Sequence, residues 1–512
     1  MSIIMVDLRK ETNNMSKKNK VKIVLPNTNK KTDRIRLLIW IDSPSCATGF
    51  ATVARGIFNY IAMLKKADGK TRKYDIDIIG VNDRGGWKNP IKYPYRIFPA
   101  KPGAQLGIGG DIYGRARLVA ALLGKDPDIL PPWDIVFTLN DAFILEQPLP
   151  VFNVGTMKVI KKTQKSSKDS LPPDWHFKVV SYWPVDSPLK ANWVENSISM
   201  ADYPVAYTKY GKEEIIKADN TLDRPTEVPK RLRVIYHGVD TDIFNPISDK
   251  EKVKYRKQLF DGKVKPETFL VTAVARNQQR KDLPRTMKIF KEFQKRRPDS
   301  FLYLHCQETD AWGSLLEYGR QFNLEMGKDW AVPAKFSANT GFPVEAMNLI
   351  YNVSDMIIST SLGEGFGFYN MEGFATKTPV LAPDNTVHPE LFNYDKSDSL
   401  DDIESLAKKV RGIPYKSGAN SSEWATYGTA DYERIRPLGN VEDAVKKMIW
   451  IYDNPDKVTK ITERAYKWVQ DYSWKKISPL WDNLFTEVYN NLKVERKNWK
   501  PPKKVKKHGN KR

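Results

Sequence analysis

The chain has 512 residues with a formal net charge of +22, and 41% of its residues are hydrophobic, which is sufficient for sizeable folded cores. It holds two cysteines, too few for a disulfide framework, and no apolar run approaches the roughly 18 residues of a membrane span. No apolar leader with a cleavage site opens the sequence, so we expect neither a secreted nor a membrane-spanning protein but a cytoplasmic one.

The positive charge is concentrated at the two ends of the chain. Residues 1–36 hold ten Lys or Arg against three acids, and residues 493–512 hold ten against one. These ends contribute +7 and +9, which leaves +22 − 16 = +6 for residues 37–492. We therefore predict basic flexible tails over residues 1–34 and 493–512, of a kind that contacts polyanions or serves solubility.

The first elements follow the pattern of an α/β domain. Residues 37–41 form an apolar run typical of a buried strand, and residues 52–64 show helical spacing. The turn between them contains a single glycine, Gly49. Strands alternate with helical patterns along most of the remaining chain, which predicts parallel sheets with right-handed crossovers.

Residues 83–117 combine positive charge with aromatic side chains. Seven basic residues stand against two acids, and five aromatic residues are interleaved with them. Such a stretch can follow a phosphate backbone and stack on an unpaired base, with Trp87 and Arg96 as candidates. The alternative is a Pro-rich loop whose aromatic residues pack on the domain.

Two carboxylates follow apolar strands in the first half of the chain. Residues 177–183 resemble a strand that ends in a polar turn with Asp186, and Asp141 ends another strand. Such a carboxylate can orient sugar hydroxyls or an acceptor nucleophile. Asp186 could equally cap a helix over residues 189–196.

A basic turn follows the strand predicted over residues 269–275. It carries Arg276 and, five positions later, Lys281, with Arg280 between them. A guanidinium and an ammonium group suit a diphosphate. We expect Arg280 to face solvent. A basic turn after a strand is also common in proteins without such a site.

The most informative segment is residues 361–375. An apolar strand over residues 355–360 leads into a Gly-rich turn and a helix start, with Glu364 before the turn and Glu372 on the helix. Strand, glycine turn and helix N-terminus point backbone N–H groups at a phosphate, and the carboxylates can accept hydrogen bonds from sugar hydroxyls. This suggests a sugar-nucleotide site, although two incidental glutamates on a surface loop remain an alternative.

The two glutamates and the Arg–Lys pair resemble the Glu-x7-Glu motif and its companion in the retaining GT-B glycosyltransferases usually numbered family four. Residues 234–246, including His237, are similar to the start of that family's interdomain linker, and residues 472–489 to its C-terminal helix. The resemblance implies an α/β protein with two Rossmann-like domains, whose parallel sheets face each other across a cleft. It assigns an acceptor-side domain, a nucleotide-sugar domain and a helix that crosses back to residues 35–240, 241–471 and 472–492.

The resemblance also implies roles for individual residues. Glu372 would hold the donor ribose, Glu364 the transferred sugar, and Arg276 and Lys281 the diphosphate. Asp186 replaces a histidine that many relatives carry near the reacting sugar. The remaining donor-side candidates are Gly49, Gly365, Phe366 and Gly367, and the acceptor-side candidates are Asp141, Trp87 and Arg96. The family needs no metal or other cofactor, and a phosphate oxygen of the donor takes the acceptor proton.

Two departures from the family pattern affect this reading. His237 stands where the family has Asn, and we expect it to be structural. Lys377 replaces a glycine that commonly ends the helix after the second glutamate, and a lysine in a left-handed conformation costs about 1 kcal/mol.

The sequence therefore predicts a retaining, metal-independent hexosyl- or pentosyltransferase that uses a nucleotide-diphosphate sugar. The acceptor is either a cell-envelope or lipid-linked glycan, with the tails on anionic lipid heads, or a hydroxylated base in DNA, as in phage-type DNA modification. The latter would place a viral protein in the host cytoplasm. The alternatives are a non-catalytic basic nucleic-acid-binding protein on the same scaffold and a nucleotide-sugar epimerase. Peripheral contact with a membrane is compatible with the tails.

Overall fold

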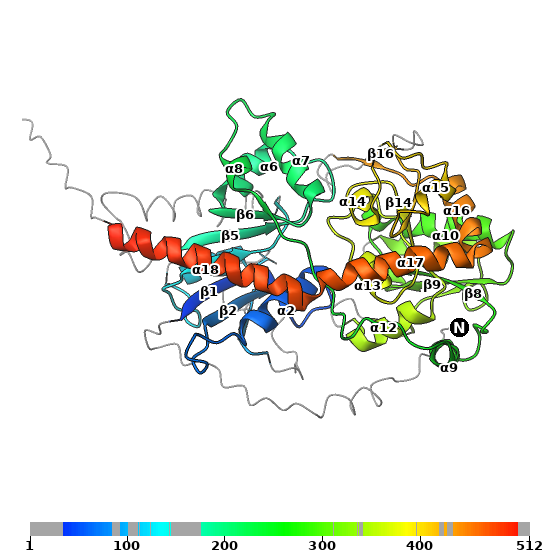
Figure 1. Ribbon diagram of the computed structural model, residues 1–512, viewed down its shortest axis with the longest axis horizontal. Coiled ribbons are helices and arrows are strands. Elements are labelled where there is room, and N and C mark those ends of the chain that lie inside the picture. The colour runs from blue at the N-terminus through cyan, green and yellow to red at the C-terminus, as the bar shows by residue number, and fades with distance from the viewer. Residues whose placement is uncertain are drawn as a thin grey trace, which may run out of the picture.

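Two α/β domains lie side by side, and one long C-terminal helix extends from the second domain across the first (Figure 1). The computed structural model describes residues 34–83, 93–100, 111, 113–122, 124–142, 144, 176–310, 312–334, 336, 341–395, 397–418, 424–426 and 434–499. Within these residues, no helix is both long enough and apolar enough to cross a bilayer. Residues 1–33 and 500–512 of the predicted tails (1–34 and 493–512), and Trp87, lie outside the described residues.

The N-terminal domain is built on a seven-stranded sheet in the order β3-β2-β1-β4-β5-β6-β7, and every pairing in it is parallel. β1 and β2 are almost entirely buried, as expected for strands covered on both faces. The strands are β1 (Ile35–Asp42), β2 (Tyr74–Val81), β3 (Arg96–Pro99), β4 (Ile135–Thr138), β5 (Lys178–Trp183), β6 (Tyr203–Ala206) and β7 (Arg233–Val234).

Helices cover this sheet and begin close to its carboxyl edge. α2 starts at Gly49, three residues earlier than its spacing predicted, because the Thr48 side chain caps it by accepting the Ala51 N–H. The other described α-helices of this domain are α3 (Arg115–Leu122), α6 (Ala191–Asn196), α7 (Lys209–Asp219) and α8 (Val228–Arg231).

The C-terminal domain has a six-stranded parallel sheet in the order β12-β9-β8-β13-β14-β15. Its strands are β8 (Phe269–Val274), β9 (Ser300–His305), β12 (Trp330–Ala331), β13 (Met356–Ile358), β14 (Val380–Pro383) and β15 (Ile413–Tyr415). Its described α-helices are α9 (Asp249–Leu259), α10 (Leu283–Gln294), α11 (Leu315–Gln321), α12 (Val344–Val353), α13 (Phe368–Ala375), α14 (His388–Phe392), α15 (Ile403–Leu406), α16 (Val441–Asp453) and α17 (Pro455–Val469). Two hairpins project from it, β10 (Thr309–Asp310) with β11 (Gly313–Ser314) and β16 (Trp424–Thr426) with β17 (Ile435–Pro437).

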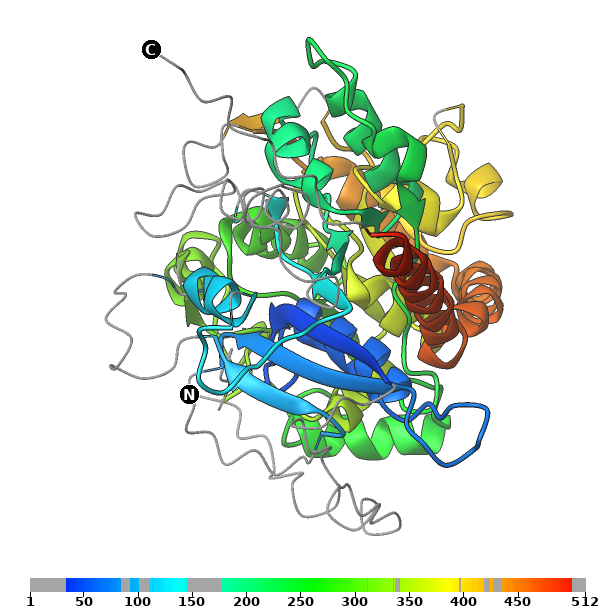
Figure 2. The same cartoon turned by 90° about the vertical axis from the view of Figure 1, so that its left-hand side faces the viewer.

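The last helix, α18 (Trp474–Asn498), crosses back onto the N-terminal domain, as the sequence predicted (Figure 1; Figure 2). Its Trp481 is fully buried against Phe137 of β4, with ring centroids 5.4 Å apart. At its start Trp474 wedges between Gly56 and Gly238, where an added Cβ would lie 2.2 Å and 2.7 Å from the indole. Only glycine therefore fits at these two positions.

The predicted boundary of the C-terminal tail is wrong. α18 continues to Asn498, through six residues that the charge count placed in a flexible tail. Arg496 explains the extension, because its guanidinium is 2.6 Å from Asp134 and also donates to the carbonyl oxygen of Trp133. The prediction for Lys377 agrees with the structure: its φ is 57°, and its ammonium pairs with Glu463 at 2.6 Å.

Candidate active site

The segment with the two glutamates lies where the two domains meet. β13 ends at Ile358, the Gly-rich turn follows, and α13 begins at Phe368. An added Cβ on Gly363 would lie 2.0 Å from the carbonyl oxygen of Asp186, so this turn touches the loop after β5 of the other domain. Gly367 has a φ of 72°, a left-handed conformation that favours glycine.

Glu364 is the acidic centre of this turn. It is buried, and its carboxylate is ion-paired with Lys281 and lies 3.3 Å from the Arg280 guanidinium. Burial alone would raise its pKa, but the charges of Lys281 and Arg280 outweigh burial and lower the pKa to about 2. Burial in turn lowers the pKa of Lys281. The carboxylate and the ammonium, 83 residues apart in the sequence, thus form one charged unit.

The prediction that Arg280 faces solvent is wrong. Its side chain is 27% exposed, and its Nε lies 3.1 Å from the Asp186 carboxylate while Nη1 donates to the carbonyl oxygen of Gly363. Arg280 belongs to the 3₁₀ turn η5 (Gln279–Lys281), and the following Asp282 has a left-handed φ of 46°. This tight turn brings Arg280 and Lys281 to the same carboxylate.

Asp186 joins the two domains. Arg436 of β17 donates from Nη1 to the Asp186 carbonyl oxygen at 2.8 Å, and its Nη2 lies 3.1 Å from the Asp186 carboxylate. Burial would raise the pKa of Asp186, but Arg280 and Arg436 reverse this and leave the pKa below its ordinary value. Asp186 is not a helix cap, because α6 begins at Ala191 with Lys190 at its N-cap. Arg436 had no signal in the sequence.

We expect Asp186→Asn to lower the free energy of unfolding by about 1–3 kcal/mol, because it leaves two inward-facing guanidinium groups without their carboxylate. Equilibrium denaturation followed by circular dichroism measures the change. Asp249→Asn is the matched control, since the Asp249 side chain is 99% exposed and should alter stability little. Equal stability of the two variants would show that the contact between the domains does not depend on this carboxylate.

Arg276 and Lys281 pair with different carboxylates. The Nε of Arg276 lies 2.8 Å from the carboxylate of Asp310 in β10, and its side chain is 53% exposed. Its charge nevertheless lowers the pKa of Asp42, at the end of β1, against the larger effect of burial, so it lies near the N-terminal domain. Arg276 and Lys281 therefore flank the site without sharing a carboxylate.

Glu372 lies on α13, toward the first helix of the other domain. Burial raises its pKa to about 7, against the opposing effects of the nearby Tyr351 hydroxyl and the charge of Arg55 on α2. The starts of these helices are close, because an added Cβ on Gly49 would lie 3.6 Å from the Phe368 ring. Gly49 thus lies beside the end of the Gly-rich turn.

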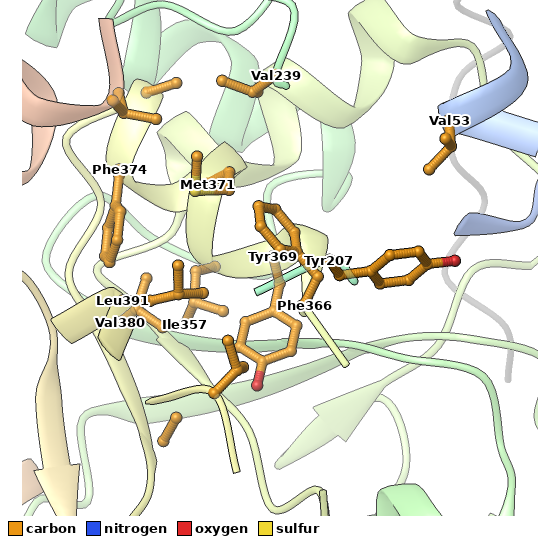
Figure 3. Packing of buried hydrophobic residues seen from close by; sticks show 14 of the residues in the cluster. Val53, Tyr207, Val239, Ile357, Phe366, Tyr369, Met371, Phe374, Val380 and Leu391 are labelled. Atoms are coloured by element: carbon orange, nitrogen blue, oxygen red, sulfur yellow. The ribbon is translucent and has the colours of Figure 1, made fainter. Parts of the chain in front are cut away.

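The side chains around the turn anchor it in the core. Phe366 is buried and packs with Tyr369 and Met371, as Figure 3 shows. Its ring therefore belongs to the core. An added Cβ on Gly365 would lie 3.4 Å from the backbone nitrogen of Val185, so this residue also adjoins the loop after β5.

His237 is a structural residue, as expected. It is buried, its Nδ1 is 2.8 Å from the hydroxyl of Tyr182, and its ring stacks on Phe368 with centroids 5.2 Å apart. Burial lowers its pKa well below the ordinary value, so the imidazole is neutral.

Asp141 lies near this network on the N-terminal side. Burial raises its pKa to about 7, the charge of Asp186 adds to the rise, and the charge of Arg280 opposes it. Asp141, Asp186 and Arg280 therefore lie within electrostatic reach of one another.

Arg96, predicted on the acceptor side, is engaged within the N-terminal domain. Its guanidinium forms a two-pronged ion pair with Asp77 of β2, with distances of 2.6 Å and 2.5 Å. Arg115 and Arg117 are buried and pair with Asp111 and Asp126. The described aromatic residues of this stretch pack on the domain. Its described arginines are engaged in ion pairs within the same domain.

Among the described residues, no group of three or more His, Cys, Asp or Glu side chains is placed to hold a metal ion. The positively charged side chains that face the Gly-rich turn are Lys281, Arg280 and Arg436.

Solved structures align with most of this chain and over the full length of their own chains. Sucrose-phosphate synthase from Thermosynechococcus elongatus aligns with a TM-score of 0.60, at 12% identity over 90% of this chain and 100% of its own. A glycosyltransferase from Rickettsia africae gives 0.59 at 16% identity, with the same coverage. HepE from Anabaena, in complex with UDP-glucose, gives 0.58 at 14% identity over 90% of this chain and 100% of its own. The chain has the GT-B fold.

Sequence similarity to this GT-B chain is more limited. No family model matches it. A D-inositol 3-phosphate glycosyltransferase from Corynebacterium aurimucosum is 28% identical over 155 residues, which are 30% of this chain. The match spans 35% of the length of that relative.

Proposed function

We propose that this protein is a glycosyltransferase that moves a sugar from a nucleotide-diphosphate sugar to a hydroxyl acceptor. The observation that carries the proposal is the convergence of Lys281 and Arg280 on Glu364, beside a Gly-rich turn and a helix N-terminus. Cations at this position would stabilise the charge that grows on a diphosphate leaving group. A carboxylate between them can accept hydrogen bonds from the hydroxyls of the transferred sugar.

The remaining donor contacts follow from the same arrangement. Lys281 and Arg276 would neutralise the diphosphate, Glu372 would accept hydrogen bonds from the ribose, and Gly365 and Gly367 would present backbone N–H groups. The binding of UDP-glucose by HepE, which shares the fold, supports a donor of this class. The reaction would retain anomeric configuration. It would need no metal, since the protein's own cations would balance the charge of the leaving group.

We favour a glycan or another sugar hydroxyl as the acceptor over DNA. The basic stretch that favoured DNA has Arg96, Arg115 and Arg117 in ion pairs within the domain, where they cannot also neutralise a phosphate backbone. The presence of Lys281, Glu364 and Glu372 in one site favours an enzyme over a non-catalytic scaffold.

The test is thermal stabilisation of the purified full chain by a panel of UDP-, GDP- and ADP-sugars. One donor class should raise the melting temperature, and Glu372→Ala should abolish the rise because the ribose loses its carboxylate. Glu345→Ala is the matched control, an exposed glutamate on α12 whose loss should leave the rise intact.

Stabilisation that survives in Glu372→Ala would remove Glu372 from the donor site. The absence of stabilisation by every donor, together with tight salt-dependent binding to DNA, would favour the non-catalytic alternative.

A further inference from the structure

The N-terminal domain presents three carboxylates at one edge of its sheet. Asp42 ends β1, and Asp141 and Asp186 lie three residues beyond the ends of β4 and β5. These strands are neighbours in one parallel sheet, so their carboxyl ends meet at the same edge. We call this set of residues, with Asn140 and Tyr207, the acceptor edge.

The three carboxylates differ in how far they are engaged. Asp42 is 6% exposed and accepts from the Thr48 hydroxyl at 2.5 Å and from the Asn82 amide at 3.0 Å. Asp186 is held by Arg280 and Arg436. Asp141, which is partly exposed, is the carboxylate best placed to accept a hydrogen bond from a ligand.

Two buried polar groups of the acceptor edge have no hydrogen-bond partner among the described residues. They are the hydroxyl of Tyr207, directly after β6, and the Nδ2 of Asn140, beside Asp141, and each residue is 3% exposed. Buried donors without partners are rare in native proteins and call for an explanation. Burial raises the pKa of Tyr207, and the charges of Tyr182, Asp141 and Asp42 raise it further, so the phenol lies within electrostatic reach of both carboxylates. In Figure 3 it points toward Val53 of α2 and away from Phe366.

Arg55 of α2 is a cation on the N-terminal side, and its guanidinium is engaged. It donates to the carbonyl oxygens of Pro44 and Cys46 at 2.8 Å and to the hydroxyl of Thr52 at 2.9 Å. The cations of the other domain that act on the edge are also engaged: Arg280 and Arg436 are paired with Asp186, and Arg276, whose charge lowers the pKa of Asp42, is paired with Asp310. A phosphate at the acceptor edge would therefore meet carboxylates whose countercharges are already taken.

We propose that the acceptor is an uncharged polyol, such as the end of an unphosphorylated sugar, whose hydroxyls bind at Asp141, Asn140 and Tyr207. Hydroxyls can donate to the carboxylate and accept from the amide and the phenol. A phosphate ester would be repelled by Asp141 and Asp42 once they are ionised, above the pKa values of about 7 and about 6 to which burial raises them. This inference rests on the proposed function.

In the transfer, the acceptor oxygen forms a bond to the anomeric carbon as the bond from that carbon to the diphosphate breaks. The hydroxyl proton passes to an oxygen of the leaving nucleoside diphosphate. Asp141 serves here as a binding group for the acceptor, and it takes no proton in this step.

The experiment measures nucleoside diphosphate release by the full chain with the donor found by thermal stabilisation. The acceptors are matched pairs: glucose with glucose 6-phosphate, and myo-inositol with its monophosphate. We expect kcat/KM to be at least about tenfold higher for the uncharged member of each pair. Asp141→Asn should reduce this preference and raise KM for the uncharged acceptors, and Tyr207→Phe should raise KM alone. Stabilisation by the donor should be unchanged in both variants.

A preference for the phosphate esters, or a preference that Asp141→Asn leaves unaltered, would overturn the inference. Saturation-transfer NMR with donor present covers acceptors that bind without turnover, and failure of every uncharged acceptor to bind would also overturn it. If the proposed function itself is wrong, no donor will stabilise the wild-type chain. This result distinguishes its failure from the failure of the acceptor inference.

Discussion

Lys281→Met is expected to lower kcat by roughly 100-fold or more, because it removes a buried cation from the group that faces the diphosphate. The Lys281 ammonium is ion-paired with Glu364, and its side chain is 15% exposed, so solvent screens its charge only partly. Methionine preserves the aliphatic length and removes the charge. The measurement is the initial rate of nucleoside diphosphate release at saturating donor.

Lys288→Met is the matched control, since Lys288 is an exposed lysine of α10 in the same domain. Its rate should equal that of the wild type. Lys281→Met should also raise the pKa of Glu364, because Lys281 is the largest charge effect that opposes burial there. If Lys281→Met keeps most of the wild-type rate while the fold is intact, the diphosphate is held by other groups.

The donor-side cluster could be predicted because its parts are local in the sequence. A strand, a glycine turn and a helix start fix where Glu364 lies relative to β13, and a strand followed by a basic turn does the same for Lys281. Parallel strands that are neighbours in a sheet then bring the two turns together. The sequence could not show the left-handed Asp282, which turns Arg280 inward.

Predictions from charge alone failed where a charged residue has a partner distant in sequence. Arg96 is 19 residues from Asp77, and Arg496 is 362 residues from Asp134, so a count of basic residues shows neither ion pair. Arg436 was missed for the same reason, because it is 250 residues from Asp186. Val488 and Leu492, four positions apart and buried, carry the apolar face of α18 to the start of the supposed tail.

Trp481→Ala is expected to lower the free energy of unfolding by about 3–5 kcal/mol, the range for truncating a large buried aromatic residue. Trp481 is fully buried, and its ring lies 4.7 Å from that of Tyr182 in β5 and 5.9 Å from that of Phe485. The cavity would lie between α18 and the N-terminal sheet, which should loosen the helix from the domain that it crosses. Equilibrium denaturation monitored by circular dichroism gives the change.

Leu480→Ala is the matched control, because the adjacent Leu480 is 45% exposed and should contribute little. If the two variants lose the same stability, α18 is a peripheral helix and Trp481 adds nothing to the core of the N-terminal domain. If only Trp481→Ala is destabilised, the core of the first domain is completed by the last helix of the chain. The acceptor edge, which includes Tyr207 beside Tyr182, then depends on that helix for its support.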